Sequence, residues 1–328
     1  MDSKRINEIF SLADRAEFEA MALDVFRYQY THNAVYGEYC RHLGTSPDRV
    51  TKLLDIPFLP LEFFKTHRVV STQGNVQTVF ESSGTTKRQT SKHFVHDLEI
   101  YRQSFLKGFT GFYGPLEDYC ILALLPSYLE RRGSSLILMV DEMIKASGHP
   151  HSGFYLHDLE ALHQRLGELE HKGEKILLIG VSFALLDLAE QYPMALGHTL
   201  IMETGGMKGR RKEMIRQELH LQLKTAFGVP EIHSEYGMTE LLSQAYSKGE
   251  GLFHCPPWMG VLTRDTEDPL AIQPFGRTGG INVIDLANVH SCSFLATQDL
   301  GKLYPDGSFE VLGRFDHSDI RGCNLMVL

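Results

Sequence analysis

The sequence predicts an α/β protein whose sheet is mostly parallel and flanked by helices, with a β-rich part toward the C-terminus. Two sequence patterns predict this fold. Between residues 75 and 236, short apolar runs alternate with helical patterns, as in parallel sheets that helices cover on both faces. After residue 250, Gly, Pro and Asp recur at short intervals, and strand patterns follow one another without helices between them.

Each element follows from its local pattern. Apolar residues recur near a 3.6-residue period over residues 1–43, so the N-terminal region 1–50 is predicted to be helical. Residues 56–65 contain two prolines, which favour an extended segment. Strands of the α/β part are expected over residues 76–80, 119–125, 175–180, 198–203 and 231–236, and helices over 96–108, 183–192 and 210–227. Strands of the β-rich part are expected over residues 279–285, 293–297 and 308–311.

Composition narrows the class of protein. The 328 residues are 43% hydrophobic, which is enough for a sizeable core, and the net charge of -9 with no basic stripe argues against a nucleic-acid binder. The chain shows no apolar run long enough to span a bilayer and no signal peptide at its start. Five scattered cysteines without a CxxC pair favour reduced thiols in a cytoplasm over disulfides or zinc. We therefore expect a cytoplasmic protein without a membrane span or a nucleic-acid partner.

A hydroxyl-rich loop follows the strand predicted over residues 76–80. It consists of Ser82, Ser83, Gly84, Thr85, Thr86 and Lys87. Ligands of open α/β sheets bind at the carboxyl ends of strands, and the pattern places the loop at such an end. Its hydroxyls and backbone N–H groups suit anionic oxygens, and the glycine permits a close backbone approach. The loop lacks the GxxxxGK[ST] pattern of a Walker A loop, and an exposed surface loop is the alternative interpretation.

Three later motifs accompany this loop: residues 234–240 (SEYGMTE), 297–301 (TQDLG) and 313–316 (GRFD). In order and spacing the four motifs resemble the adenylate-forming superfamily of acyl-CoA synthetases, luciferases and peptide-synthetase adenylation domains. Residues 56–65 (IPFLPLEFFK) and 321–323 (RGC) are similar to one branch, the acyl-protein synthetases of the LuxE type. The resemblance runs from about residue 50 to the C-terminus.

The resemblance implies ATP and Mg²⁺ as cofactors and gives each matching residue a role. In the 82–87 loop, Ser82, Ser83, Thr85 and Thr86 would bind the β- and γ-phosphates of ATP, beside Gly84 and Lys87. Thr239 would reach the α-phosphate, and Glu240 would hold Mg²⁺ through its carboxylate. At the nucleoside end, Gly205 and Gly206 would lie beside the adenine, and Tyr236, followed by Gly237, would stack on it. Asp299 would accept hydrogen bonds from both ribose hydroxyls, and Arg314 would contact ribose or phosphate. Asp316, in the last motif, has a charged turn residue as its alternative interpretation.

The implied reaction is the activation of a carboxylic acid, expected to be a fatty acid, to acyl-AMP, followed by transfer to a protein cysteine as a thioester. Cys323 matches the acceptor by its RGC context, and a structural cysteine beside the apolar tail 325–328 is the alternative. The implied partner is an acyl-accepting reductase or carrier protein. A CoA ligase related to phenylacetate–CoA ligase and a non-catalytic nucleotide-binding protein are the competing functions.

The resemblance also divides the chain. It implies a large adenylate-forming domain over residues 1–312 and a short hinge-like segment over 313–328. The small C-terminal domain that is usual in the superfamily carries a lysine that assists adenylation, and this domain is expected to be absent or vestigial here. Lys87 or Lys92 is then the expected substitute for that lysine.

Overall fold

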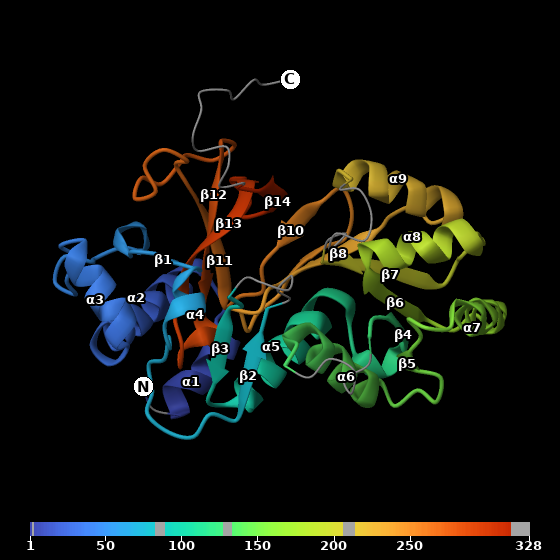
Figure 1. Cartoon of the computed structure of the whole chain (residues 1–328), viewed down its shortest axis with the longest axis horizontal. Coiled ribbons are helices and arrows are strands. Elements are labelled where there is room, and N and C mark those ends of the chain that lie inside the picture. The colour runs from blue at the N-terminus through green and yellow to red at the C-terminus, as the bar shows by residue number, and fades with distance from the viewer. Residues whose placement is uncertain (2, 83–88, 127–132, 206–213, 316–328) are drawn as a thin grey trace.

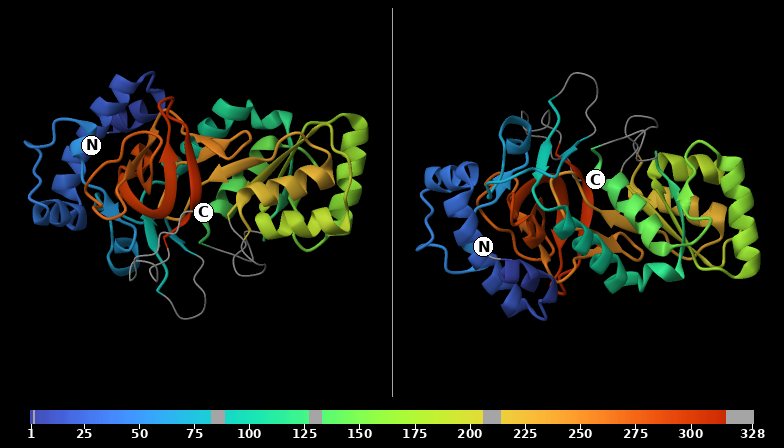
Figure 2. Two further views of the ribbon diagram at one scale, coloured as in Figure 1. Left: turned by 90° about the horizontal axis from the view of Figure 1, so that it is seen from above. Right: turned by 90° about the horizontal axis from the view of Figure 1, so that it is seen from below.

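The structure is a computed structural model that describes residues 1, 3–82, 89–126, 133–205 and 214–315 (Figure 1). The N-terminal region is helical, as predicted: it forms α1 (Ser3–Glu8), η1 (Ile9–Ser11), α2 (Arg15–His32), α3 (Ala34–His42) and η2 (Leu53–Asp55). Asp14 caps α2 by accepting a hydrogen bond from the backbone N–H of Glu17. Figure 2 shows the β-rich part between these helices and the α/β part.

The α/β part contains five parallel strands in the order β8-β7-β6-β4-β5 among the described residues. Their bounds are β4 (Cys120–Leu124), β5 (Gly153–Phe154), β6 (Ile176–Val181), β7 (Thr199–Thr204) and β8 (His233–Tyr236). Every residue of β4 and β6 is buried, because helices cover both faces of this sheet. In Figure 1, α8 (Ser182–Gln191) and α9 (Arg216–Phe227) lie on one side, and α5 (Leu98–Tyr113) and α6 (Ser135–Ser147) lie on the other.

The same sheet continues into the β-rich part, where the strand directions become antiparallel. It contains β9 (Ala245–Ser247), β10 (Leu252–His254), β11 (Met259–Arg264), β12 (Thr278–Asp285), β13 (Phe294–Leu303) and β14 (Phe309–Arg314). The order along this half is β11-β12-β13-β14-β10-β9, and β9 pairs with β8. The sheet therefore changes from parallel to antiparallel between β8 and β9. Three further helices belong to the described residues: η3 (Leu116–Asp118), α7 (Leu159–Lys172) and η4 (Leu286–Asn288).

Two expectations about local structure were wrong. The strand β2 (Thr78–Glu81) pairs antiparallel with β3 (Lys92–Val95) in a separate two-stranded sheet, so the hydroxyl loop connects a hairpin and does not follow a strand of the parallel sheet. Residues 56–65 are extended only in part: β1 (Leu59–Pro60) pairs parallel with β13, and a helical turn, α4 (Phe63–Thr66), follows. The turn forms once the prolines are passed, and it buries Phe64.

The remaining differences concern the ends and the number of elements. The helix expected over 210–227 begins at Arg216, with residues 206–213 outside the described part of the chain. The elements α6, α7, β3, β5, β9, β10 and β11 were not predicted. None of the helices within the described residues is both long and apolar enough to cross a membrane.

Candidate nucleotide-binding site

Three residues predicted to bind the nucleoside meet where three strands come together. Tyr236 ends β8, Asp299 lies in β13, and Arg314 ends β14. The Tyr236 hydroxyl donates a hydrogen bond to Asp299 Oδ2 at 2.8 Å, and Arg314 Nε donates to Asp299 Oδ1 at 3.0 Å. Asp299 and Arg314 are direct partners in the antiparallel register of β13 and β14. The fold therefore gathers three motifs that are far apart in the sequence around one carboxylate.

The ring of Tyr236 lies in an aromatic cluster under the site. Its centroid is 5.9 Å from that of Phe253 and 5.7 Å from that of Phe309, and both contacts are steeply tilted. The side chain is buried, and burial together with the charge of Asp299 raises the pKa of Tyr236 well above its usual value. The phenol is thus a permanent hydrogen-bond donor to the carboxylate. Stacking on adenine stays a prediction.

Asp299 keeps acceptor capacity beyond these two bonds. From the described residues each carboxylate oxygen accepts one hydrogen bond, whereas an ionised carboxylate offers about four lone-pair sites. The backbone N–H of Asp299 donates to Thr297 Oγ1 at 3.1 Å, which fixes the strand locally. The carboxylate is therefore held in place and still able to accept from two ribose hydroxyls.

The turn that follows β8 carries the residues predicted for the α-phosphate and the metal. His93 Nδ1 donates to the carbonyl of Thr239 at 2.9 Å, and Asn288 Nδ2 donates to the carbonyl of Glu240 at 2.7 Å. Gly237 starts the turn, and a Cβ there would lie 2.4 Å from Glu235 Oε1, so only glycine fits without a rearrangement. The turn is thus held from β3 on one side and from η4 on the other.

The carboxylate of Glu240 is buried, with 6% of the residue exposed. Burial raises its pKa, while a hydrogen bond with Ser91 and the charges of Arg314 and Lys65 oppose that rise. Among the described residues no cation lies within 4.0 Å of this carboxylate. A buried carboxylate without a close cation is a suitable ligand for a hard divalent ion.

The base of the hydroxyl loop lies next to this turn. The backbone N–H of Ser82 donates to the Ser91 carbonyl at 3.1 Å, and the Ser91 N–H donates to Ser82 Oγ at 2.9 Å. Because Ser91 also bonds to Glu240, the hairpin base and the predicted metal ligand are in contact. Lys92, one of the two expected substitute cations, is exposed and lies 3.6 Å from the carboxylate of Glu81.

Several predicted residues lie outside the part of the chain that the structure describes: Ser83, Gly84, Thr85, Thr86, Lys87, Gly206, Asp316 and Cys323. Gly205 is described, and its φ of +69° is a left-handed value that favours glycine. The Ser182 hydroxyl donates to the Gly205 carbonyl at 2.8 Å, which fixes the chain where it leaves β7.

Sequence reasoning missed two buried carboxylates at the carboxyl ends of β7 and β8. Burial raises the pKa of Glu203, but its hydrogen bond with His220 and the charge of Arg216 outweigh burial and leave that pKa below its usual value. Burial raises the pKa of Glu235 to about 7, against a hydrogen bond that the Thr204 hydroxyl donates to it. The position of Glu235 directly before Tyr236 in the motif was the one available signal.

A third missed carboxylate, Asp285, supports the far side of the turn. It accepts hydrogen bonds from the backbone N–H groups of Leu242 at 2.7 Å and Ser243 at 3.0 Å, and from the Ser243 hydroxyl at 2.5 Å. Burial raises its pKa to about 6 despite these donors. Asp285 therefore orders the chain directly after Glu240.

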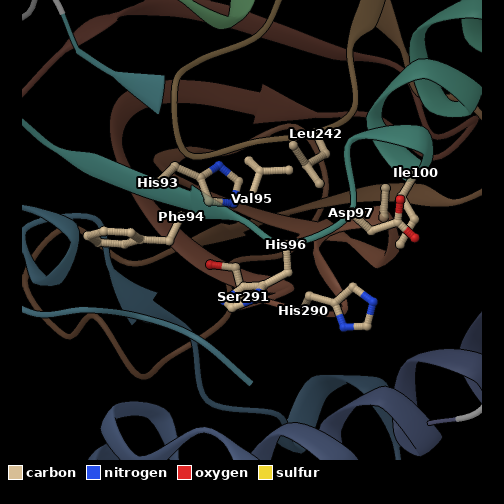
Figure 3. Close-up of a pocket in the computed structure, with 10 residues that line it drawn as sticks. His93, Phe94, Val95, His96, Asp97, Ile100, Leu242, His290 and Ser291 are labelled. Carbon is tan, nitrogen blue, oxygen red and sulfur yellow. The ribbon is translucent and has the colours of Figure 1, made fainter. Parts of the chain in front are cut away.

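A small cavity of about 10 Å³ lies beside the turn, with His93, His96 and His290 among its lining residues (Figure 3). That volume accommodates about one water molecule. The pKa of His93 is lowered to about 4 by burial, so its ring is neutral and donates to Thr239 from Nδ1. The described residues contain no group of three or more His, Cys, Asp or Glu side chains arranged to hold a metal ion.

Known proteins resemble this chain both in sequence and in structure. A family model described as acyl-protein synthetase, LuxE, matches residues 10–127. A curated relative, the long-chain-fatty-acid–luciferin-component ligase of Photorhabdus luminescens, is 36% identical over 66 residues, which cover 20% of this chain and 56% of the relative. The predicted resemblance to LuxE-type acyl-protein synthetases is confirmed. The matched region contains residues 56–65 and the hydroxyl loop, and it ends before the other three motifs.

Solved structures confirm the predicted fold class. ATP-bound MatB from Rhodopseudomonas palustris has a TM-score of 0.56 at 17% identity, over 74% of this chain and 49% of MatB. 2-Hydroxyisobutyryl-CoA ligase in complex with 2-HIB-AMP and CoA has a TM-score of 0.66 at 15% identity, over 95% of this chain and 71% of that ligase. At these identities the likeness shows the fold alone. The chain spans about half the length of MatB and of the curated relative.

Proposed function

We propose that this chain activates a carboxylic acid with ATP and transfers the acyl group to a cysteine thiol. The observation that carries the proposal is the convergence of Tyr236, Asp299 and Arg314 next to the turn with Thr239 and Glu240. The proposed nucleoside end and the proposed phosphate end come from separate motifs of the sequence. ATP and a carboxylic acid, expected to be a fatty acid, are the proposed substrates.

In the first step a carboxylate oxygen of the acid attacks the α-phosphorus of ATP. The bond from the α-phosphorus to the bridging oxygen breaks, acyl-AMP forms, and pyrophosphate leaves with the electron pair. The acid is already ionised near neutral pH, so no general base is needed. Positioning by Asp299, Thr239 and the hydroxyl loop supplies most of the rate in this proposal.

Glu240 is the proposed ligand for Mg²⁺. Mg²⁺ usually binds one or two protein carboxylates together with substrate phosphates and waters, and the buried Glu240 carboxylate fits that requirement. When bound, the ion would neutralise charge on the phosphates. Ser91 orients the carboxylate from the base of the hydroxyl loop.

The second step transfers the acyl group from acyl-AMP to the Cys323 thiolate, with release of AMP. The chemistry of the other cysteines favours this assignment. Burial raises the pKa of Cys40 to about 12, of Cys120 to about 11 and of Cys255 to about 12, and it raises the pKa of Cys292 further still. These thiols are poor nucleophiles near neutral pH, because the thiolate is the reactive form. An acyl-accepting reductase or carrier protein is the proposed onward partner.

The proposed domain division follows the same assignment, with the large domain over residues 1–312 and a hinge-like segment over 313–328. Arg314 stands at this boundary, because it ends β14 and bonds to Asp299. In this proposal the hinge-like segment delivers Cys323 to acyl-AMP.

The test is incubation with ATP, Mg²⁺ and radiolabelled acids, followed by a denaturing gel. Label on wild-type protein that hydroxylamine removes, with none on Cys323→Ser, is the expected result. Cys255→Ser is the matched control and keeps its label. Equal label on Cys323→Ser removes that cysteine from the mechanism. ATP binding without pyrophosphate release indicates a non-catalytic nucleotide-binding protein, and CoA-dependent release of free acyl-CoA indicates a CoA ligase.

A further inference from the structure

The segment that enters α4 is fixed against the strand that carries Asp299. Leu59 and Pro60 of β1 pair with Leu295 and Ala296 of β13, and the backbone N–H of Leu61 donates to the Ala296 carbonyl at 3.2 Å. Figure 1 shows α4 next to both β1 and β3. This N-terminal segment therefore lies alongside the strand that carries Asp299.

Contacts on both sides of Lys65 define where α4 lies. On one side, the buried ring of Phe64 meets that of His93 edge-on at 5.7 Å, and His93 bonds to Thr239. On the other side, Glu62 accepts a hydrogen bond from the side chain of Gln298, the neighbour of Asp299. Gln298 and Asp299 are successive residues of β13, so their side chains point to opposite faces of that strand. The turn that carries Lys65 therefore lies beside β13 and next to the histidine that holds Thr239.

Lys65 forms no ion pair with a described carboxylate, and its positive charge acts on Glu240. It contributes to lowering the pKa of Glu240 against burial, as does Arg314. Arg314 is already bonded to Asp299, whereas Lys65 has no carboxylate within 4.0 Å among the described residues. The side chain is half-buried, which strengthens its electrostatic effect relative to an exposed lysine.

We propose that Lys65 is a catalytic residue of the adenylation step, which rests on the function proposed above. Its ammonium group donates hydrogen bonds to the non-bridging oxygens of the α-phosphate that Thr239 holds. Negative charge accumulates on these oxygens while the acid's oxygen bonds to the α-phosphorus and pyrophosphate departs. A cation fixed there before the reaction stabilises the transition state more than bound ATP, so its removal lowers kcat more than ATP affinity.

The test compares acid-dependent exchange of labelled pyrophosphate into ATP for wild type, Lys65→Met and Lys65→Arg. Lys52→Met is the matched control, since Lys52 is an exposed lysine in the preceding segment. We expect Lys65→Met to lose about 100- to 1000-fold in kcat, a size typical for the removal of one donor to an oxygen on which charge develops. Lys65→Arg is expected to recover part of that loss, and Lys52→Met to match wild type.

Chemical rescue distinguishes a catalytic role of Lys65 from a structural one. Exchange by Lys65→Ala that is restored with propylammonium ion supports the catalytic role, and melting temperatures report whether each variant is folded.

The outcomes separate the two proposals. Wild-type exchange with an unchanged Lys65→Met kcat overturns the role of Lys65 and leaves the proposed function standing. A Lys65→Ala protein that melts like wild type and whose exchange propylammonium ion does not restore also overturns it. Absence of exchange by wild type with every acid from acetate to palmitate overturns the proposed function, and the role of Lys65 with it.

Discussion

Replacing Asp299 with asparagine should weaken ATP binding by one to two orders of magnitude. The substitution keeps the size of the side chain and removes the charge that accepts from Tyr236 at 2.8 Å, from Arg314 at 3.0 Å and, in the proposed complex, from the ribose hydroxyls. Hydrogen bonds to a charged group contribute about 1.5–3 kcal/mol each. Loss of one such bond to the ribose corresponds to about a 10- to 150-fold increase in Kd.

The assay is titration calorimetry with ATP and Mg²⁺ on wild type, Asp299→Asn and the control Asp306→Asn. Asp306 is an exposed aspartate on the turn after β13, and it bonds only to Ser308 among the described residues. The control is expected to bind ATP like wild type. An Asp299→Asn protein that melts like wild type and binds ATP with unchanged affinity refutes the assignment of the ribose site.

Two further substitutions probe the buried groups behind the site. Because the folded pKa of Glu235 is about 7 and its ordinary value is 4.5, the unfolded chain binds fewer protons between these values, so the group's contribution to stability falls as pH rises from about 4.5 to 7. Glu235→Gln should therefore raise the free energy of unfolding at pH 8 by up to about 3 kcal/mol, seen as a higher melting temperature, and should change it little at pH 4.5. Equal shifts at both pH values contradict the raised pKa. Gly237→Ala places a Cβ 2.4 Å from Glu235 Oε1 and should cost about 1–3 kcal/mol in denaturant unfolding, whereas Gly167→Ala, which meets nothing within 4 Å in α7, should be neutral or stabilising. Equal stabilities of the two glycine variants would show that the turn tolerates a side chain.

Much of the fold was predictable because parallel strands buried on both faces have continuous apolar sequences. The runs that became β4 and β6 are of this kind, and the predicted bounds of β4, β6 and β7 differ from the observed ones by one residue at each end. The hairpin partner β3 (KHFV) carries no such signal, since it is short and half polar, so the local pattern did not reveal that β2 leaves the main sheet.

Some residues of the candidate site were also predictable from the sequence, and others were not. Tyr236, Asp299 and Arg314 could be named from their motifs, and their meeting point follows from the pairing of β13 with β14. Glu235 and Asp285 could not be named from the sequence, because their burial depends on the packing of the folded sheet. Glu235 pairs with Tyr246 of β9, and Asp285 accepts hydrogen bonds from the chain that follows Glu240. Lys65 belongs to the motif over residues 56–65, but its position next to the site depends on the pairing of β1 with β13.

The separate β2–β3 hairpin has a consequence for substrate selection. Its described contacts with the phosphate turn are the bonds of Ser91 and His93 to Glu240 and Thr239, whereas Asp299 lies in a strand that pairs with three others. The residues proposed to hold the sugar are therefore built into the main sheet, whereas the hydroxyl loop proposed for the phosphates belongs to a separate two-stranded hairpin. Under the proposed function, we expect strict selection of the nucleoside and tolerance of changes in the length or bridging atoms of the polyphosphate.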